Sequence, residues 1–231
     1  MTGLALFVTG TDTGAGKTSA ACALIRALRA LDLRVAPMKP VASGACSTAA
    51  GLRNDDALAL LAACSADYDY DDVNPYVFEP ATAPHLAAAD AGVEIRFAPI
   101  QAALARLRSR ADVVVVEGAG GWRVPLGADA SIASLARALG LPVLLVVGVR
   151  LGCINHALLT LDAIRADGCP IAGWIANAID PLFADAGRSI DAIAARAALP
   201  PLATLPWQPQ AWLDCDVNAA RLLVATLKGL R

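Results

Sequence analysis

The chain has 231 residues, is 57% hydrophobic and carries a formal net charge of −2. A charge balance this close to neutral argues against partners that are recruited by the overall field of a protein, such as nucleic acid or an anionic membrane surface. The length and the apolar composition favour one α/β domain, residues 1–231, with a sizeable core.

The chain shows no features of export. The apolar run from Leu4 to Val8 is too short for a signal peptide, and no apolar stretch reaches the length of a membrane span. The six cysteines are scattered and form no C-x-x-C pair. We therefore expect a reduced, cytoplasmic protein.

The N-terminal stretch predicts a phosphate loop. A strand that begins at Leu4 and ends at Thr9 leads into a glycine-rich turn, and Gly16-Lys17-Thr18 opens a helix predicted over Thr18 to Leu31. Backbone N–H groups, a helix start and a lysine together bind phosphate, and in this motif the hydroxyl after the lysine holds Mg²⁺. The loop is one residue longer than the simple G-x-x-x-x-G-K-[ST] pattern, because Thr11 stands where that pattern has glycine.

A second lysine follows the next predicted strand, Val35 to Lys39, which Pro40 closes. Lysine is scarce in this chain, since only Lys17, Lys39 and Lys228 occur among nineteen basic residues. A lysine ammonium is a compact point charge that arginine does not replace at a transferring group, so the two N-terminal lysines are candidate functional residues.

The remaining elements alternate between helix and strand. Helices are predicted over Leu52 to Ala63, Ile100 to Arg110, Asn155 to Ala166, Asp185 to Ala198 and Val217 to Leu230. Strands are predicted over Asp112 to Val116, Leu141 to Val147, Ile171 to Ala176 and Pro201 to Leu205. The segment from Ser65 to Pro99 is the least regular. This alternation predicts a doubly wound, mainly parallel sheet with helices on both faces, of the P-loop NTPase type.

Ligands bind such sheets at the carboxyl ends of the strands, where the unusual residues of this chain fall. Glu117 ends a buried strand and precedes Gly118-Ala119-Gly120, and Asp56 lies near a helix start. Two carboxylates near phosphates suit Mg²⁺, which takes hard oxygen ligands. A solvated strand-end acid and an ordinary helix cap are the alternative interpretations of these two residues.

Two further strand ends carry weaker signals. The segment from Val149 to His156 is a glycine turn that enters a helix without lysine, which suits a carboxylate ligand. The alternative interpretation is that Asn155 is only a helix cap and that His156 is a core residue. Asn177, Pro206 and Trp207 follow the last strands and can read an adenine edge, while Trp207 is equally compatible with packing alone.

Taken together, GTDTGAGKT, KPVASG, RNDDALAL, VEGAGGW, LGCINHALLT and the AN and PW pairs resemble the dethiobiotin synthetase family in order and spacing over nearly the whole chain. The resemblance implies a parallel P-loop α/β fold and a homodimer. It also implies a ligase of biotin synthesis that converts 7,8-diaminononanoate, CO₂ and MgATP to dethiobiotin, ADP and phosphate, through a carbamate and a carbamic-phosphoric anhydride.

The resemblance also implies roles for individual residues. The nucleotide site would comprise Gly14, Ala15, Gly16, Lys17, Thr18, Ser19, Asp56, Glu117, Gly118, Ala119 and Gly120, with Asn177, Pro206 and Trp207 at the adenine end. Mg²⁺ would be held by Thr18, Asp56 and Glu117. Lys17 and Lys39 would be the catalytic lysines, and Thr13 and Ser43 would contact the diamine. Leu151, Gly152, Cys153 and Asn155 would hold the substrate carboxylate of the neighbouring subunit.

Some family members have glutamate and valine where this chain has Gly14 and Ala15, and some have an acid where it has Ala178. The resemblance therefore leaves contacts of the loop acid and the degree of adenine selectivity open.

Two other classes share parts of this pattern. Amidotransferase synthetases such as cobyrinate diamide synthase normally carry a glutaminase domain, for which we expect no room in 231 residues. Partitioning and cell-division ATPases carry a signature lysine at the position of Asp12. Their membrane-binding versions end in a basic amphipathic helix. Arg221, Lys228 and Arg231 give the last predicted helix a basic character, but a packed terminal helix explains it more simply.

Overall fold

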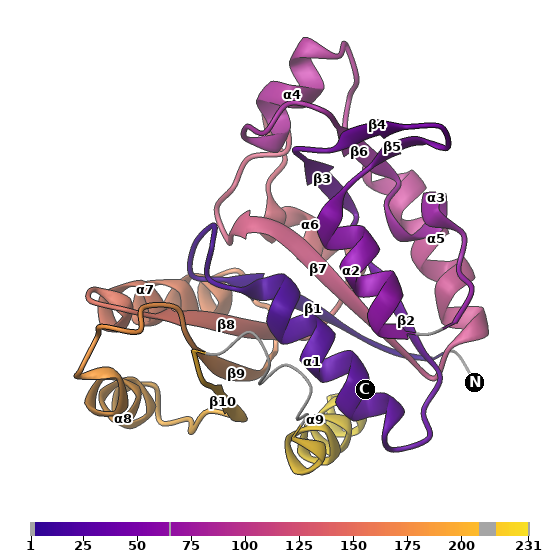
Figure 1. Ribbon diagram of the computed structural model, residues 1–231. Helices are drawn as coiled ribbons and strands as arrows, with labels where there is room; N and C mark the ends of the chain where they lie inside the picture. Colours follow the sequence, from indigo (N-terminus) through magenta and orange to yellow (C-terminus); the bar gives the residue numbers. More distant parts are fainter. Residues whose placement is uncertain (1–2, 65, 208–215, 231) are drawn as a thin grey trace.

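The computed structural model describes residues 3–64, 66–207 and 216–230 (Figure 1). Its centre is a six-stranded sheet in the order β10-β9-β8-β1-β7-β2, and each pair of neighbours is parallel. The strands are β1 (Leu4–Gly10), β2 (Val35–Met38), β7 (Val113–Gly121), β8 (Val143–Val149), β9 (Ile171–Ala178) and β10 (Ala203–Leu205). The predicted parallel α/β sheet is confirmed.

Helices cover both faces of this sheet, which is why β1 and β8 are buried over their whole length and read as continuous apolar runs. The longer helices are α1 (Lys17–Arg29), α2 (Asp55–Cys64), α5 (Phe97–Arg110), α6 (Ile132–Leu139), α7 (Cys153–Ala166), α8 (Ala186–Ala197) and α9 (Val217–Gly229). Helices α1 and α9 pack against each other and against β1, whereas α5 and α6 pack against β7 and α7 packs against β8. Figure 1 shows α1 in front of the sheet and α9 below it. Among the described residues, no helix combines the length and apolarity that crossing a membrane requires.

Several boundaries differ from the predicted ones. The helix predicted from Leu52 begins at Asp55, because the side chain of Asn54 accepts hydrogen bonds from the backbone N–H groups of Asp56 (3.1 Å) and Ala57 (3.3 Å) and so caps it. The strand predicted to end at Val116 continues through Glu117 to Gly121. Helix α5 begins three residues before Ile100, since proline is tolerated in a first helical turn and does not delay the start.

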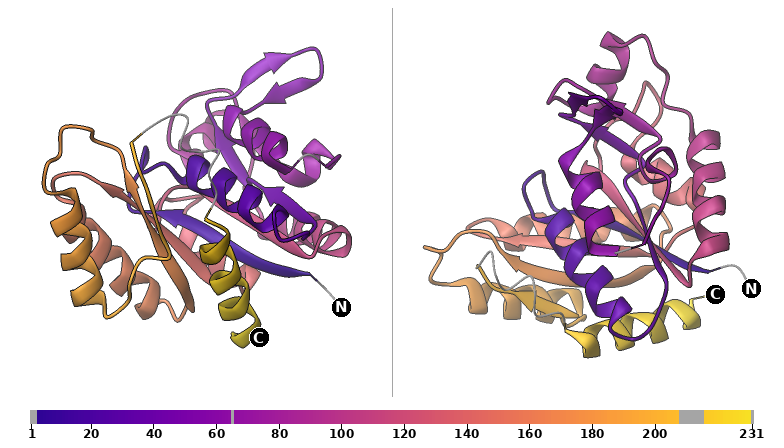
Figure 2. Two further views of the ribbon diagram at one scale, coloured as in Figure 1. Left: turned by 60° about the horizontal axis from the view of Figure 1, so that its bottom comes forward. Right: turned by 45° about the vertical axis from the view of Figure 1, so that its right-hand side comes forward.

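The segment from Ser65 to Pro99 contains more structure than its sequence suggests. It holds α3 (Tyr70–Val73), β6 (Tyr76–Phe78) and α4 (Pro84–Asp90). Strand β6 pairs in parallel with β3 (Val41–Ser43), and β4 (Cys46–Thr48) pairs with β5 (Gly51–Arg53) as an antiparallel hairpin. Figures 1 and 2 show these small strands and α4 grouped beyond the carboxyl edge of the central sheet. Ser65 and Arg231, and Cys215 among the six cysteines, lie outside the described residues.

Helix α6 has no counterpart among the predicted elements. Ser131 and Ser134 form a capping box at its start, and Gly140 ends it in a left-handed conformation with φ 62°. Its eight residues are too few for a clear periodic pattern. The helix packs behind β7 and holds the segment that leaves the carboxyl end of that strand.

Candidate active site

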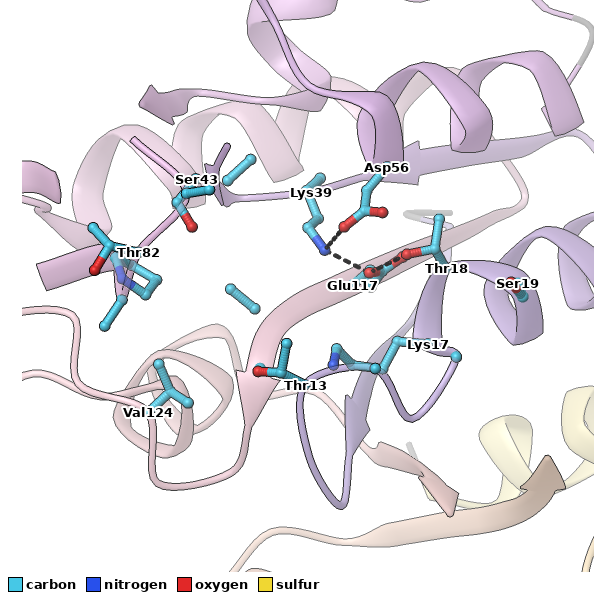
Figure 3. Close-up of a pocket in the computed structure, with 18 residues that line it drawn as sticks. Thr13, Lys17, Thr18, Ser19, Lys39, Ser43, Asp56, Thr82, Glu117 and Val124 are labelled. Carbon is cyan, nitrogen blue, oxygen red and sulfur yellow. Dashed lines mark hydrogen bonds and ion pairs between the residues drawn. The ribbon is translucent and has the colours of Figure 1, made fainter. Parts of the chain in front are cut away.

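A cavity of about 670 Å³ opens beside the phosphate loop at the carboxyl edge of the sheet (Figure 3). Separate parts of the chain build it: the loop before α1, the segment after β2, the start of α2, the turn before α4 and the end of β7. The predicted site residues that line it are Thr13, Gly14, Gly16, Lys17, Thr18, Ser19, Lys39, Ser43, Asp56, Glu117, Ala119 and Gly120. One space thus collects most of the residues that the sequence singles out.

The phosphate loop depends on two glycines in the left-handed region, Gly14 at φ 75° and Gly16 at φ 83°. Lys17 begins α1 directly after Gly16, and its ammonium donates a hydrogen bond to the carbonyl oxygen of Asp12 at 3.0 Å. Burial, together with the nearby charge of Lys39, lowers the pKa of Lys17 to about 8. The loop therefore holds a cation whose charge is destabilised until an anion arrives.

Lys39 is the centre of a buried ionic cluster. Its ammonium lies 2.8 Å from Asp56 Oδ2 and 2.5 Å from Glu117 Oε1, and it also reaches the Gly118 carbonyl at 3.4 Å. The Thr18 hydroxyl donates to Glu117 Oε1 at 2.9 Å. Figure 3 shows the three charged groups and Thr18 facing one another between the phosphate loop and α2.

The cluster shifts the pKa values of its members. Burial opposes the charge of Lys39, but Glu117 and Asp56 outweigh it and hold the pKa of Lys39 above its usual value. Burial likewise opposes the charge of Asp56, yet Lys39 outweighs it and lowers the pKa of that carboxyl group. Lys39 is therefore an ammonium and Asp56 a carboxylate at neutral pH.

One atom of this cluster has no partner. Glu117 is fully buried, and its Oε2 makes no hydrogen bond within the described part of the chain. A buried carboxylate oxygen is costly to leave unpaired. The described residues contain no group of three acidic, histidine or cysteine side chains suited to a metal. This donor set of two carboxylates and a hydroxyl instead fits Mg²⁺, which takes its remaining ligands from phosphates and water.

Asn177 lies under the phosphate loop, at the carboxyl end of β9. It is 2% exposed, and its amide nitrogen donates to the Ala15 carbonyl at 2.9 Å. A side chain at Gly16 would overlap that amide, which requires glycine there. The amide oxygen Oδ1 of Asn177 has no hydrogen-bond partner among the described residues. This oxygen is a free acceptor beside the phosphate loop.

Pro206 and Trp207 are brought near Asn177 by strand pairing, because Leu205 lies opposite Asn177 in the β9–β10 register. Both residues are exposed, and Trp207 keeps 53% of its surface accessible. Trp207 is therefore not a core residue.

The turn between β8 and α7 lies beside the phosphate loop but does not line the cavity. Arg150 contacts Asp12 at 3.2 Å, and the Gly148 N–H donates to the Thr11 hydroxyl at 3.3 Å. Gly152, at φ 93°, is the N-cap of α7, so Asn155 does not cap this helix. Leu151 is 83% exposed, whereas Cys153 is buried.

The cavity also contains residues that the sequence analysis misses. They are Ala42, Ala81, Thr82, Ala83, Pro84 and Val124. The segment 81–84 forms the wall opposite the phosphate loop (Figure 3). Pro80 and Pro84 mark a turn there, but no residue of the segment carries a charge or a recognisable motif.

Comparison with known proteins identifies the family. A family model described as an AAA domain matches residues 4–212. The chain is 55% identical over 218 residues to the ATP-dependent dethiobiotin synthetase BioD of Xanthomonas campestris pv. campestris, covering 94% of this chain and 97% of that protein. The chain belongs to the dethiobiotin synthetase family. A second member, from Pseudomonas paraeruginosa, is 55% identical over 203 residues, or 87% of this chain and 89% of that protein.

Solved structures confirm the fold expected for a dethiobiotin synthetase. The MinC:MinD cell division protein complex of Aquifex aeolicus matches with a TM-score of 0.63 and 18% identity over 96% of each chain. A ParA family ATPase from Chlorobium tepidum matches with a TM-score of 0.54 and 14% identity over 97% of this chain and 98% of that one. At such identities the likeness shows a shared P-loop fold alone. The family is an ATP-dependent ligase family, which confirms the expected enzyme class.

Proposed function

We propose that this protein carboxylates 7,8-diaminononanoate with CO₂ at the expense of ATP and closes the product to the cyclic urea dethiobiotin, releasing ADP and phosphate. The proposal extends the family relationship to a defined reaction. The observation that carries it is the single cavity in which the phosphate loop faces Lys39, Asp56 and Glu117 (Figure 3). That arrangement suits transfer of a phosphoryl group, which needs positioning and charge neutralisation more than a covalent nucleophile.

The nucleotide occupies the loop side of the cavity. The backbone of Gly14 to Ser19 and the Lys17 ammonium bind its phosphates, while Asn177, Pro206 and Trp207 bind the base. The free Oδ1 acceptor of Asn177 supports this assignment, since the exocyclic amino group of adenine is a donor. Gly118 to Gly120 complete the phosphate side.

Thr18, Asp56 and Glu117 hold Mg²⁺ in this proposal, and the unpartnered Oε2 of Glu117 supports the assignment. A bound Mg²⁺ supplies charge neutralisation at the β- and γ-phosphates. Lys39 forms ion pairs with the same two carboxylates. We infer that its ammonium turns from the carboxylates toward the γ-phosphate when the nucleotide binds.

The reaction proceeds in three chemical steps. One substrate amine attacks the carbon of CO₂ and forms a carbamate, with loss of a proton. A carbamate oxygen attacks the γ-phosphorus, and the bond from phosphorus to the ADP oxygen breaks. The second amine then attacks the carbamate carbon. The bond between that carbon and the phosphate oxygen breaks, phosphate leaves with the electron pair, and a second proton is lost. Lys17 and Lys39 neutralise the charge on the transferred group.

The diamine occupies the opposite side, near Thr13 and Ser43, which line the cavity with Thr82 (Figure 3). These hydroxyl groups can accept hydrogen bonds from its amines. Holding both amines beside the anhydride lowers the barrier to ring closure by an amount that reaches about 7 to 11 kcal/mol in favourable cases.

The substrate carboxylate is held by a neighbouring subunit in a homodimer. Its site is the start of α7, from Leu151 to Asn155, where a helix N-terminus favours a carboxylate. The 83% exposure of Leu151 in the single chain supports an interface at this turn.

The reaction is tested by phosphate release from MgATP with purified protein. We expect release only when diaminononanoate and bicarbonate are both present, and omission of either should reduce it to background. A switch ATPase of the MinD type hydrolyses ATP without the diamine. Equal phosphate release without the diamine would overturn the proposal, and ATP-dependent sedimentation with liposomes would favour the ATPase.

A further inference from the structure

A buried contact ties the active-site wall to the far end of α7. Trp122 follows the last residue of β7 and is 3% exposed. Its indole N–H donates to Asp167 Oδ2 at 2.7 Å. Asp167 is the C-cap of α7 and lies 45 positions further along the chain. This hydrogen bond therefore joins two elements that are separate in sequence.

Asp167 does not stabilise the helix that it caps. A carboxylate at a helix C-terminus faces carbonyl groups and is unfavourable there. Its side chain is only 17% exposed, and the same Oδ2 forms an ion pair with the Arg123 guanidinium at 2.8 Å. One hydrogen bond and one ion pair from the segment after β7 thus stabilise a charge that α7 alone disfavours. The contacts of Asp167 with Trp122 and Arg123 therefore explain the carboxylate at this position better than helix stability does.

Trp122 leads directly to the cavity. Two residues later, Val124 lines it, and the Val124 N–H donates to the Gly121 carbonyl at 3.2 Å. Gly120 has φ 62°, and a Cβ there would lie 2.7 Å from Val124 Cγ2 and 3.3 Å from Thr13 Oγ1. Val124 and Gly120 each lie two residues from Trp122 along the chain, and they are closely packed with each other and with Thr13.

The affected wall belongs to the diamine side. Figure 3 shows Val124 on the side of Thr82 and Ser43, away from Ser19 at the nucleotide side. Helix α7 also starts at Gly152, where the proposed function puts the carboxylate of the neighbouring subunit's substrate. One helix thus contributes its start to the partner's site and its C-cap to its own.

We propose that Asp167 is a positioning residue that sets the diamine wall through the indole of Trp122, and that α7 connects the two active sites of a dimer in this way. The proposal rests on the proposed function for its effect on the diamine. It predicts that loss of the hydrogen bond weakens use of the diamine while leaving use of ATP unchanged.

The kinetic test compares four variants by KM and kcat. Trp122→Phe removes the N–H and keeps a ring, and Asp167→Ala removes the acceptor. Both should raise KM for diaminononanoate about ten-fold, the effect of one hydrogen bond to a charged group, with KM for ATP unchanged. Asp167→Asn keeps an acceptor oxygen and should stay within about two-fold of the wild type. Arg123→Ala is the matched control. It should also stay within about two-fold of the wild type, because the Arg123 side chain is 61% exposed and water screens its charge.

A purely structural role predicts a different pattern, in which less folded enzyme lowers the apparent kcat and leaves both KM values unchanged. That pattern, or an equal rise in KM for Arg123→Ala, would overturn the proposal. Hydrogen exchange of the peptide over residues 117–126 provides a readout that needs no substrate. Trp122→Phe and Asp167→Ala should speed exchange there, whereas Arg123→Ala should not. Unchanged exchange in all variants refutes the positioning role even if the reaction itself proves different.

Discussion

Replacement of Lys39 by methionine tests the ionic cluster most severely. The variant keeps the volume of the side chain and removes its charge. In the wild type Lys39 is 3% exposed, and its ammonium lies 2.5 Å from Oε1 of the fully buried Glu117. Without it, Glu117 keeps only the Thr18 hydroxyl as a partner among the described residues. The buried carboxylate of Glu117 thus loses its nearest countercharge, and Lys17 is a more distant cation that still acts on it.

The expected destabilisation follows from that geometry. Removing one partner of a buried ion pair costs about 3–5 kcal/mol. Asp56 adds little, because its side chain is 45% exposed and water screens it. For a chain of this length, each kcal/mol lowers Tm by about 2–4 °C, so we expect Lys39→Met to melt roughly 6–20 °C below the wild type.

The double variant Lys39→Met with Glu117→Gln is the matched control. It removes both charges, and replacing a whole buried ion pair is often neutral for stability. We expect the double variant to recover most of the lost Tm in thermal unfolding and most of the lost free energy of unfolding in urea. Neither variant should turn over. If Lys39→Met melts with the wild type, or if the double variant is less stable than the single one, the assignment of a buried ion pair here is wrong.

Three further outcomes are expected. ATP affinity should weaken as pH rises through about 8, because the lowered pKa of Lys17 means that its ammonium loses a proton there in the free enzyme. Calorimetry should show that Lys17→Arg loses this pH dependence. A wild-type affinity that does not change with pH contradicts the assignment. Asn177→Ala should reduce the preference for ATP over GTP in a competition assay, and an unchanged preference would exclude the Asn177 amide from base recognition. Peptide mapping after brief thiol labelling should find the exposed Cys46 modified before Cys22 and Cys64. Burial raises the pKa of the Cys22 thiol to about 11 and that of the Cys64 thiol to about 12. Early labelling of Cys64 would contradict this order and show that its helix opens readily.

The sequence predicted the chemistry of the site better than its shape. Lys39 directly follows β2 and Glu117 lies in the neighbouring strand β7, and the rule that parallel strands present their carboxyl ends at one edge was sufficient to bring them together. The partners of Asn177 follow from the same rule. These residues have recognisable types at strand ends, so a pattern along the chain can find them.

The far wall of the cavity follows no such rule. Ala81 to Pro84 approaches the phosphate loop only because β6 pairs with β3, and three-residue strands leave no periodic signal. The contact between Trp122 and Asp167 depends on the path of the chain behind the sheet. Neither is visible from residue type, since a small apolar turn and a buried tryptophan are ordinary components of many folds.

Incorporation of labelled bicarbonate tests the proposed reaction most directly. The purified protein is supplied with MgATP, 7,8-diaminononanoate and ¹³C-bicarbonate, and the products are analysed by mass spectrometry and nucleotide chromatography. We expect one ¹³C atom in the urea carbonyl of dethiobiotin and one ADP for each molecule formed. ADP formation without labelled dethiobiotin would contradict the proposed function.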